Sequence, residues 1–577
     1  MTLRLRGMMS KKEHIENPVT TWQLVKLYWQ SDQKKTAYFY LITLLVLTLF
    51  LVAMSVAITY WYKHFWNAIQ DYNKSLVFEL VFVFVGIAAI FVITAVYKFY
   101  VQARFGVRWR EWLTCHVIDI WLQGQSYYYI ENFDEYTDNP DQRIQEDVNQ
   151  FVALTTSLFL GVVDAVVTLF SFIALLWILS GPFVFNLGSL GPISVPGYLV
   201  WIALIYSLIG TYLTHKIGKN LISLNFRQQK KEADFRFNAV RIRSNAENIA
   251  LYQAEEQEKA GIFKSFAKVI EITLQVINRE KKLLYFTAGF NQISIIIPLL
   301  AALPMYFAKL IQIGGIQQIS SAFSQVENSL SFFVNSYTSI AQWRAVVLRL
   351  TTFMNKMQVV EHKYADVKKL ERAEHAAPTV MTNDLTVYTQ TGHRLLTDLN
   401  VVFKPGEDYL IKGPSGVGKS TFIKALAGIW PFASGGVKLP AGKKIMYLPQ
   451  RSYFPLGSLR EVLLYPGNIS VDDRQLCSLL DEVGLPRLKG GLDEIKNWSE
   501  ILSLGEQQKV AFIRVILAAP DWVFLDESTS SLDRDNERKL YRLLKEKLPS
   551  CSIVSVAHRE SVADYHDEEV VFKPNPE

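Results

Sequence analysis

Apolar runs long enough to cross a lipid bilayer are the feature that most constrains how this chain can fold. The chain has 577 residues, of which 50% are hydrophobic and 13% are aromatic, and the runs recur along its N-terminal part. They lie at residues 37–60, 76–100, 151–180, 197–215, 284–310 and 322–341. A spanning helix needs about 20 mainly apolar residues, and hydrocarbon tolerates only backbone whose polar groups are paired. We therefore expect an α-helical transmembrane domain with six spans.

Polar residues interrupt several of these runs. Pro298 and Pro304 lie in the fifth run, Gln325 and Glu327 lie in the sixth, and Asp164 lies in the third. Polar groups at membrane depth often face a water-filled cavity, and an ionisable group there is a functional hypothesis by default. Asp164 and Glu327 are therefore expected to contact a polar substrate or to carry a proton. The alternative is that they lie near a polar cavity without contacting anything.

The positions of the charges predict the orientation, although the net charge of +6 is modest. Lys and Arg are concentrated before the first run, between the second and third, and between the fourth and fifth. Residues 181–197 and 311–321 carry no charge. Since basic loops stay in the cytoplasm, the N-terminus, the long connections and the C-terminus are predicted to be cytoplasmic.

Three further segments suggest the domain organisation. Residues 21–33 are predicted to form an amphipathic helix, which either lies at the membrane interface or packs on its neighbours. Residues 226–281 combine charges with apolar residues at helical spacing, which indicates helices that continue below the membrane. The composition then changes. We expect a transmembrane domain over 1–354, a charged linker over 355–378 and an α/β domain over 379–577.

A glycine-rich loop marks the α/β domain. It follows a strand-like run at 408–412 and precedes a helix-like run at 421–429. Its residues are Gly413, Pro414, Ser415, Gly416, Val417, Gly418, Lys419, Ser420 and Thr421. In this context, successive backbone N–H groups cradle a phosphate at a helix N-terminus. The lysine then reaches the β- and γ-phosphates, and the serine hydroxyl ligates Mg²⁺.

More motifs follow in order along the chain. Gln450 stands in a Leu-Pro-Gln-Arg segment, and residues 502–508 read Leu-Ser-Leu-Gly-Glu-Gln-Gln. An apolar strand at 522–525 runs into Asp526 and Glu527, and a Ser-Leu-Asp segment ends at Asp533. His558 closes the set after another apolar strand.

This order of motifs resembles the ATP-binding cassette, the engine of ABC transporters, from about residue 379 onward. The resemblance implies ATP and Mg²⁺ as ligands. It implies that Asp526 holds Mg²⁺ through water and that Glu527 polarises the attacking water or acts as its general base. Gln450 would contact Mg²⁺ and face the membrane domain, and His558 would contact the γ-phosphate. Tyr388 lies at the position that stacks on adenine, with a core aromatic as the alternative.

The same resemblance implies a dimer. In this family, residues equivalent to Ser503 and Gly505 cover the γ-phosphate bound to the opposite cassette, and the equivalent of Asp533 contacts across the same seam. The chain has a single phosphate loop and a single such segment, so a homodimer is expected, or a heterodimer with a sister half-transporter. Leu504 departs from the usual glycine and loses its conformational freedom. We nevertheless expect an active ATPase.

The membrane half resembles one branch of these transporters. Asn139-Pro140-Asp141-Gln142-Arg143-Ile144, followed by Glu146 and Asp147, is similar to the cytoplasmic loop of ABC subfamily D. That branch includes peroxisomal fatty-acyl and lysosomal cobalamin half-transporters, and SbmA/BacA-related bacterial proteins share the loop. The segment would help to dock the membrane domain onto the cassette, and its alternative is an ordinary helix N-terminus.

The resemblance implies an ATP-driven transporter in a bacterial inner membrane. Its solute would be hydrophilic, such as a peptide or a cobalamin-like vitamin, taken up or exported. Fatty-acyl or lipid transport, and an ATP-gated channel or regulatory subunit, stay open as alternatives. A soluble DNA-repair or ribosome-associated ATPase of the same superfamily conflicts with the six apolar runs, so no nucleic-acid partner is expected.

Overall fold

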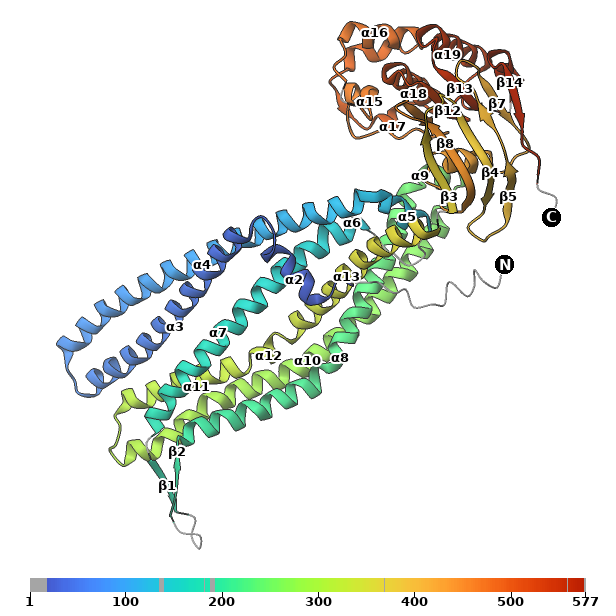
Figure 1. Ribbon diagram of the computed structural model, residues 1–577. Helices are drawn as coiled ribbons and strands as arrows, with labels where there is room; N and C mark the ends of the chain where they lie inside the picture. The colour runs from blue at the N-terminus through green and yellow to red at the C-terminus, as the bar shows by residue number, and fades with distance from the viewer. Residues whose placement is uncertain are drawn as a thin grey trace. The chain divides into compact units, whose positions relative to one another are not determined.

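The computed structural model describes residues 18–574, apart from 134–139, 181, 187–191, 368, 468 and 558. The chain forms two compact units. The helical unit comprises the described residues of 17–121 and 136–355, and the α/β unit comprises those of 122–135 and 356–577. Figure 1 shows long helices in the first unit and two sheets with covering helices in the second.

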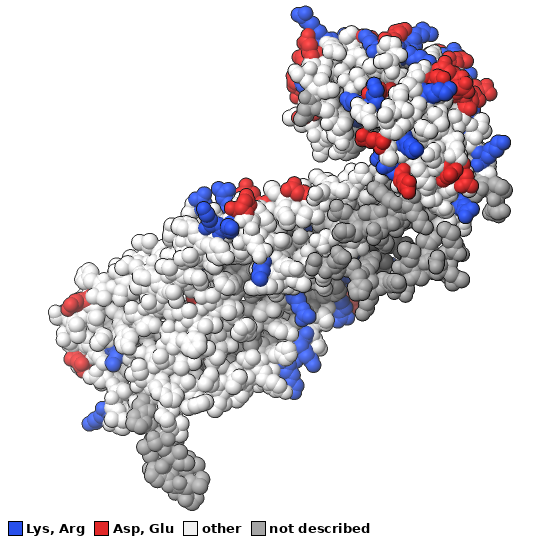
Figure 2. Space-filling model, in the orientation of Figure 1, with Lys and Arg blue, Asp and Glu red and all other residues white. Residues whose placement is uncertain are grey.

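Five helices of the described chain are long and apolar enough to cross a membrane. They are α3 (Lys34–Gln70), α4 (Lys74–Leu122), α7 (Val148–Ser180), α8 (Tyr198–Ser244) and α10 (Glu255–Phe307). Large apolar side chains such as Phe39, Phe82 and Ile93 are exposed along α3 and α4. Figure 2 shows a helical unit whose visible face is mostly uncharged. Apolar surface of this extent is suited to lipid and unsuited to water.

The sixth predicted span has different boundaries in the structure. Residues 322–341 are divided among three helices: α11 (Ile313–Leu330), α12 (Phe332–Asn335) and α13 (Tyr337–Val367). Within the described residues this segment is not among the helices apolar enough to span by composition. Its polar residues, Gln325 and Glu327 included, lower the hydropathy. Packing against other helices holds it instead, since α11 buries Phe323 and Val326 in the core of the bundle.

Close approach of helices makes the helical unit compact. Phe172 of α7, Leu199 of α8, Ala302 of α10 and Phe323 of α11 meet in one buried cluster. At Gly314, an added Cβ would lie 2.1 Å from the backbone oxygen of Lys63 on α3. Small residues at helix contacts are the usual means of tight packing in membranes, where apolar burial alone does not drive association.

The short helix α2 (Thr21–Trp29) packs on the long helix α4. Leu24 and Tyr28 are buried, and the Tyr28 ring stacks on Trp109 with 5.5 Å between centroids. Trp22 faces outward with 65% of its surface exposed. The amphipathic pattern thus serves packing on one face of the helix and leaves an exposed aromatic ring, with the Lys26 ammonium 5.2 Å from its centroid, on the other.

Beyond the span helices, the helical unit has short elements at its ends. They are α6 (Pro140–Gln142), a π-helical turn at Arg143–Asp147, the antiparallel hairpin of β1 (Pro182–Asn186) and β2 (Pro192–Pro196), and α9 (Ala246–Tyr252). The charged residues of 226–281 lie on α8, α9 and α10, as their helical spacing predicts.

A buried carboxylate that pairs with two arginines stabilises the end of the Asn-Pro-Asp-Gln-Arg segment. Asp147 is 1% exposed. It accepts from Arg143 at 2.7 Å and from two nitrogens of Arg349 on α13, at 2.6 and 2.9 Å. These hydrogen bonds raise the pKa of Arg349 above its ordinary value. A paired buried charge is stable only while its partners remain.

We therefore expect Asp147→Asn to destabilise the helical unit by about 2 kcal/mol, because two arginines lose their counter-charge. The measurement is the midpoint of thermal unfolding in detergent. Asp141→Asn, which neutralises an exposed carboxylate of the same segment, is the matched control. Equal midpoints for the two variants would contradict the stabilising role of the triad.

The α/β unit contains two five-stranded sheets. In the first, all strands are parallel, in the order β14 (Glu568–Val571), β7 (Tyr409–Lys412), β13 (Ser552–Val556), β12 (Trp522–Asp526) and β9 (Ile445–Leu448). The second follows the order β3 (Lys369–His375), β8 (Ala433–Pro440), β4 (Val380–Tyr388) and β5 (Arg394–Leu399), with β6 (Val402–Phe403) on β4. A small ladder joins β10 (Gly457–Ser458) to β11 (Ile495–Lys496).

Helices cover this unit. They are α5 (Ser126–Phe133), α14 (Lys419–Leu426), α15 (Leu459–Leu464), α16 (Asp473–Glu482), α17 (Trp498–Ile501), α18 (Leu504–Ala518) and α19 (Arg534–Lys547), with 3₁₀ turns at Gln123–Gln125, Pro486–Gly491 and Glu560–Tyr565. One core lies around Phe403, Phe422 and Phe524, and another around Phe512 and Tyr541. The segment expected to be a linker, 355–378, holds the end of α13 and strand β3, which pairs in parallel with β8.

Candidate nucleotide site

The parallel sheet brings the sequence motifs to one edge. The phosphate loop follows β7, Gln450 follows β9 by two residues, and Asp526 ends β12. Register places Asp526 beside Val556 of β13, and Val556 beside Ile411 of β7. Ligands of open α/β sheets bind beyond the carboxyl ends of the strands. The strand order therefore assembles residues that are far apart in the sequence.

Two glycines give the phosphate loop its shape. Gly413 has φ 156° and Gly418 has φ 109°, values that side chains rarely adopt. A Cβ at Gly413 would lie 2.7 Å from the backbone oxygen of Phe572, and one at Gly418 would lie 3.1 Å from Cβ of Leu395. Glycine is needed at Gly413 because both the backbone angle and the neighbouring strand exclude a side chain. The exposed residues Pro414, Ser415 and Gly416 form the tip, and Val417 is buried beneath it.

Lys419 begins α14 and turns back into the loop. Its Nζ donates to the carbonyls of Gly413 at 2.7 Å and Pro414 at 3.0 Å. Burial lowers the pKa of Lys419, while the charges of Glu527 and Asp526 oppose that shift. A buried ammonium with only carbonyl acceptors gains from an anion. The lysine is thus placed to exchange these carbonyls for phosphate oxygens.

Ser420 and Asp526 form a pair of oxygen ligands. The Ser420 hydroxyl donates to Oδ1 of Asp526 at 2.8 Å. Burial raises the pKa of Asp526, an effect that the Ser420 hydrogen bond, Lys424 and Lys419 reduce. No cluster of three or more His, Cys, Asp or Glu suited to a metal occurs in the described chain. A hydroxyl and one carboxylate fit Mg²⁺, which takes few protein ligands and completes its shell with phosphate and water.

Glu527 holds a strained backbone next to this pair. Its φ is 47°, in the left-handed region, and its N–H donates to the Val556 carbonyl at 3.0 Å. Gln450 donates from Nε2 to the Glu527 carboxylate at 3.0 Å. Strain of this kind persists where the surrounding structure imposes it and is concentrated at functional sites. The backbone turn directs the Glu527 carboxylate toward Gln450, two residues after β9.

Because burial disfavours its charged form, the Asp526 carboxylate costs stability above the pKa of an unfolded aspartate. We expect Asp526→Asn to raise the unfolding midpoint of the nucleotide-free protein by a few degrees, since an amide oxygen still accepts from Ser420. The stabilisation should vanish as the pH falls through the pKa of the unfolded aspartate, when both states are protonated. Calorimetry between pH 4 and 8 measures it. A lower midpoint at neutral pH would show that the carboxylate is stabilising.

The Leu-Ser-Leu-Gly-Glu segment starts helix α18. Ser503 is the N-cap and forms a capping box with Glu506, which Arg487 holds at 2.7 Å. Leu504 is the first helical residue and is 53% exposed. It has no positive φ, so the leucine in place of glycine causes no backbone strain here. A Cβ at Gly505 would lie 3.2 Å from the Ser531 carbonyl, so the glycine permits close approach of the following loop.

The loop after Glu527 is tied to α18. Gln508 donates to the Ser530 hydroxyl at 3.3 Å and accepts from the Ser531 N–H at 3.0 Å. Arg559 donates to the Ser530 carbonyl at 2.9 Å. Asp533 caps α19 by accepting from Asn536 N at 2.7 Å, a contact that lowers the pKa of Asp533. Gln508 and Arg559 were not predicted from the sequence as site residues. The signal available was their closeness in the sequence to Ser503 and His558.

A buried arginine holds the segment that follows Gln450. Arg514 of α18 donates to the carbonyls of Val462 and Tyr453, each at 2.7 Å, and its guanidinium lies 4.7 Å from the Phe454 ring centroid. Burial lowers the pKa of Arg514 to about 10. Sequence reasoning missed it, although an arginine inside the apolar run 510–516 is a detectable signal. It links the Gln450 segment to the helix that Ser503 begins.

Tyr388 lies half-buried at the end of β4, beside the segment 122–133. Trp430 donates from Nε1 to the Tyr388 carbonyl at 2.9 Å. The ring of Phe133 on α5 meets Trp430 edge-on at 5.5 Å, and Gln390 donates to the Asn132 carbonyl at 3.2 Å. The helix that docks on the α/β unit is thus α5, which sequence reasoning did not identify. His558 lies outside the described residues.

The two carboxylates predicted in spans have different surroundings. Glu327 of α11 is buried and accepts from the Ser294 hydroxyl of α10. Gln318 of α11 is also fully buried, and neither polar atom of its side chain has a hydrogen-bond partner in the described structure. Asp164 is exposed on α7. Polar groups within a membrane bundle mark a pathway or a packing contact.

Comparison with known proteins agrees with this geometry. A family described as "ABC transporter transmembrane region 2" matches residues 24–307, and one described as "ABC transporter" matches residues 396–530. A solved structure of a bacterial Atm1-family ABC exporter with ATP bound is similar with a TM-score of 0.73 and 17% identity, over 95% of each chain. These matches define the class: a helical transmembrane region and an ATP-binding domain fused in one chain.

Relatives along nearly the whole length narrow the class. An uncharacterized ABC transporter ATP-binding protein of Haemophilus influenzae is 34% identical over 96% of this chain and 92% of its own length. The inner membrane ABC transporter ATP-binding protein YddA of Escherichia coli is 32% identical, over 94% and 96%. The human lysosomal cobalamin transporter ABCD4 is 26% identical, over 80% and 79%. The chain belongs to the ABC transporters.

Proposed function

We propose that the chain hydrolyses ATP and uses the free energy to move a solute across a membrane. The observation that carries this is the joining, in one chain, of bilayer-length apolar helices to a phosphate loop whose lysine and serine lie beside Asp526 and Glu527. Two units of such different surface chemistry in one chain point to coupled work.

The residues at the sheet edge can share the hydrolytic chemistry. Glu527 takes a proton from water, the water oxygen bonds to the γ-phosphorus, and the bond to the β-phosphate oxygen breaks to leave ADP. Gln450 orients the carboxylate through its 3.0 Å hydrogen bond. Ser420 and Asp526 would hold Mg²⁺, which supplies charge neutralisation when bound. His558 and Tyr388 remain proposed contacts for the γ-phosphate and adenine.

Replacing Glu527 by glutamine should reduce ATP turnover about 100-fold or more, because general-base catalysis contributes that much, while ATP still binds. Phosphate release and equilibrium binding of a labelled ATP analogue measure the two effects separately. Glu546→Gln removes an exposed carboxylate of α19 and serves as the control. Unchanged turnover in Glu527→Gln would refute the assignment.

We propose that two copies complete each site. Ser503 and Asp533 have their recorded side-chain contacts within their own helix starts, and Leu504 is exposed at the N-terminus of α18. A helix N-terminus attracts anions. Presented to a second copy, this end would cover a γ-phosphate held by the partner's loop.

Two inactive variants should therefore complement each other. A Lys419→Ala chain lacks the phosphate contact and a Ser503→Arg chain blocks the opposite face, so each homodimer has two damaged sites. A mixed dimer with two-fold symmetry of its interface keeps one intact site. After co-expression, mixed dimers purified through a different tag on each chain should recover about half of wild-type turnover, because one of their two sites is intact. No recovery in verified mixed dimers would favour sites built within one chain.

Coupling is proposed to pass through α5. Its Phe133 lies on Trp430 and Phe432 of the α/β unit, and the chain continues from α4 into this helix through the 3₁₀ turn at Gln123–Gln125. ATP closes the cassettes through its higher affinity for the closed state, and α5 would transmit the motion. We place the α/β unit in the cytoplasm because of the basic loops, and we place the chain in a bacterial inner membrane because of its similarity to YddA.

The proposed solute is hydrophilic, such as a peptide or a cobalamin-like vitamin. Support comes from the polar residues Gln318 and Glu327 inside the bundle and from the similarity to the human lysosomal cobalamin transporter. Fatty-acyl transport and an ATP-gated channel are the alternatives. Stimulation of ATP turnover by candidate solutes in reconstituted vesicles, followed by uptake against a gradient, separates these three. Glu327→Ala with unchanged uptake would exclude a solute contact there.

A further inference from the structure

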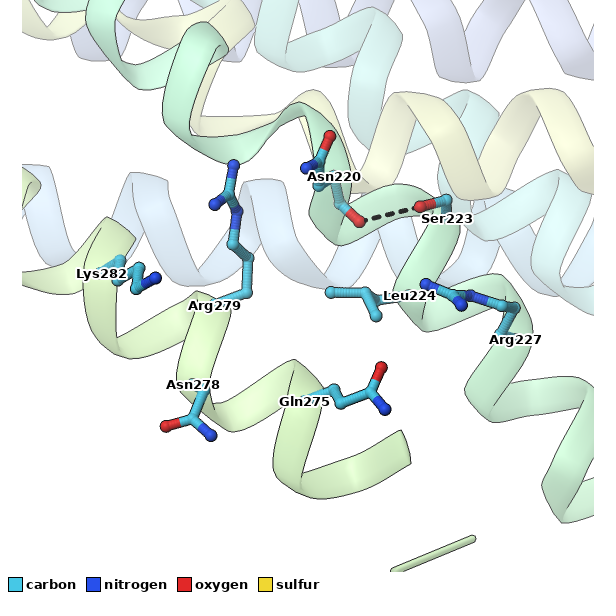
Figure 3. Close-up of a pocket in the computed structure, with 8 residues that line it drawn as sticks. All are labelled: Asn220, Ser223, Leu224, Arg227, Gln275, Asn278, Arg279 and Lys282. Atoms are coloured by element: carbon cyan, nitrogen blue, oxygen red, sulfur yellow. Dashed lines mark hydrogen bonds between the residues drawn. The ribbon is translucent and has the colours of Figure 1, made fainter. Parts of the chain in front are cut away.

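A groove between α8 and α10 has the chemistry of an anion site. It encloses about 390 Å³ and is bordered by three cations, Arg227, Arg279 and Lys282, and by the amides of Asn220, Gln275 and Asn278. None of the residues that line it is acidic. Figure 3 shows Arg279 reaching from α10 toward α8, with Lys282 one turn further along the same helix.

The charges of the groove are not neutralised within the described part of the helical unit. No ion pair of Arg227, Arg279 or Lys282 occurs among the described residues, and the Nε–H of Arg279 is buried without an acceptor. A buried donor is normally satisfied, and an exception requires an explanation such as an unseen ligand. Three cations that share one cavity repel one another unless an anion lies between them.

One apolar side chain, Leu224 of α8, lines the groove. It packs with Leu221, Ile272 and Val276 in a small cluster that joins α8 to α10. Further along, Gln228 donates to the Thr273 hydroxyl at 3.1 Å and joins the same two helices. These contacts hold the two helices together beside the cations.

The depth of two of the cations, Arg279 and Lys282, matches a lipid headgroup. The apolar run of α10 begins at about residue 284. With a rise of 1.5 Å per residue, Lys282 and Arg279 lie roughly 3 and 8 Å outside the hydrocarbon. The headgroup layer on each side is about 5–8 Å thick. Basic pockets between membrane helices at this level bind anionic headgroups.

We propose that the groove binds the phosphodiester headgroup of an anionic glycerophospholipid. Arg279 and Lys282 contact the phosphate oxygens, Arg227 and the amides contact the polar head, and the acyl chains extend into the bilayer. The proposal rests on the membrane embedding of the proposed function and does not depend on ATP hydrolysis. It assigns a lipid site to a surface outside the nucleotide machinery.

The test is a titration of fluorescent phosphatidylglycerol into the full-length protein in detergent, with phosphatidylcholine as the neutral lipid. Arg279→Gln/Lys282→Gln should weaken phosphatidylglycerol binding tenfold or more and leave phosphatidylcholine unaffected. Lys268→Gln/Lys281→Gln removes the same charge from exposed positions of α10 that do not line the groove. That control should bind like the wild type. Equal weakening in both double variants would overturn the proposal, since general surface charge would then explain the binding.

Inorganic phosphate distinguishes the two sources of the same chemistry. Millimolar phosphate should compete poorly, because it lacks the apolar body, and displacement of the lipid by phosphate at equal concentration would overturn the lipid assignment. ATP turnover of the groove variant in phosphatidylcholine vesicles should equal that of the wild type. A wild type that hydrolyses no ATP but binds phosphatidylglycerol selectively would refute the proposed function and leave the lipid site standing.

Discussion

The parallel order of β14, β7, β13, β12 and β9 is the constraint on which the nucleotide site depends. Parallel pairing puts every carboxyl end at one edge, so the phosphate loop, Gln450 and Asp526 meet although the sequence separates them widely. The same pairing holds Glu527 in its left-handed backbone through the Val556 carbonyl. Burial of Asp526 and Lys419 in this edge costs stability in each case, which metal and phosphate would offset.

The N-termini of three helices lie next to residues of the proposed nucleotide site. Lys419 stands at the start of α14, Leu504 at the start of α18 and Arg534 at the start of α19, and each start presents unpaired N–H groups. The first points at the phosphate loop of its own chain. Gln508 and Arg514 of α18 bind the neighbouring loops. This helix is therefore tied both to the loop after Glu527 and to the segment that follows Gln450.

Local signals were predictable from the sequence, and contacts between distant segments were not. The strands that precede Gly413 and Glu527 are short apolar runs followed by motif residues, so their positions agree with β7 and β12. The boundaries of the sixth predicted run were not predictable, because the polar residues of α11 interrupt the apolar pattern of a helix that packing stabilises. The packing of α5 on Trp430 brings together aromatic rings some 300 positions apart in the sequence. Hydrophobic periodicity cannot predict such a contact.

Arginine side chains occur in two different electrostatic surroundings in the helical unit. Arg143 and Arg349 share the buried Asp147, so one carboxylate balances part of their charge inside the helical unit and the ion pairs act in packing. On α8 and α10, Arg227 and Arg279 share a cavity without a carboxylate in its lining. An uncompensated cation pair is unfavourable unless an outside anion joins it. Because lipid phosphate is abundant at that depth of a membrane, the bilayer itself can supply the counter-charge that the chain withholds.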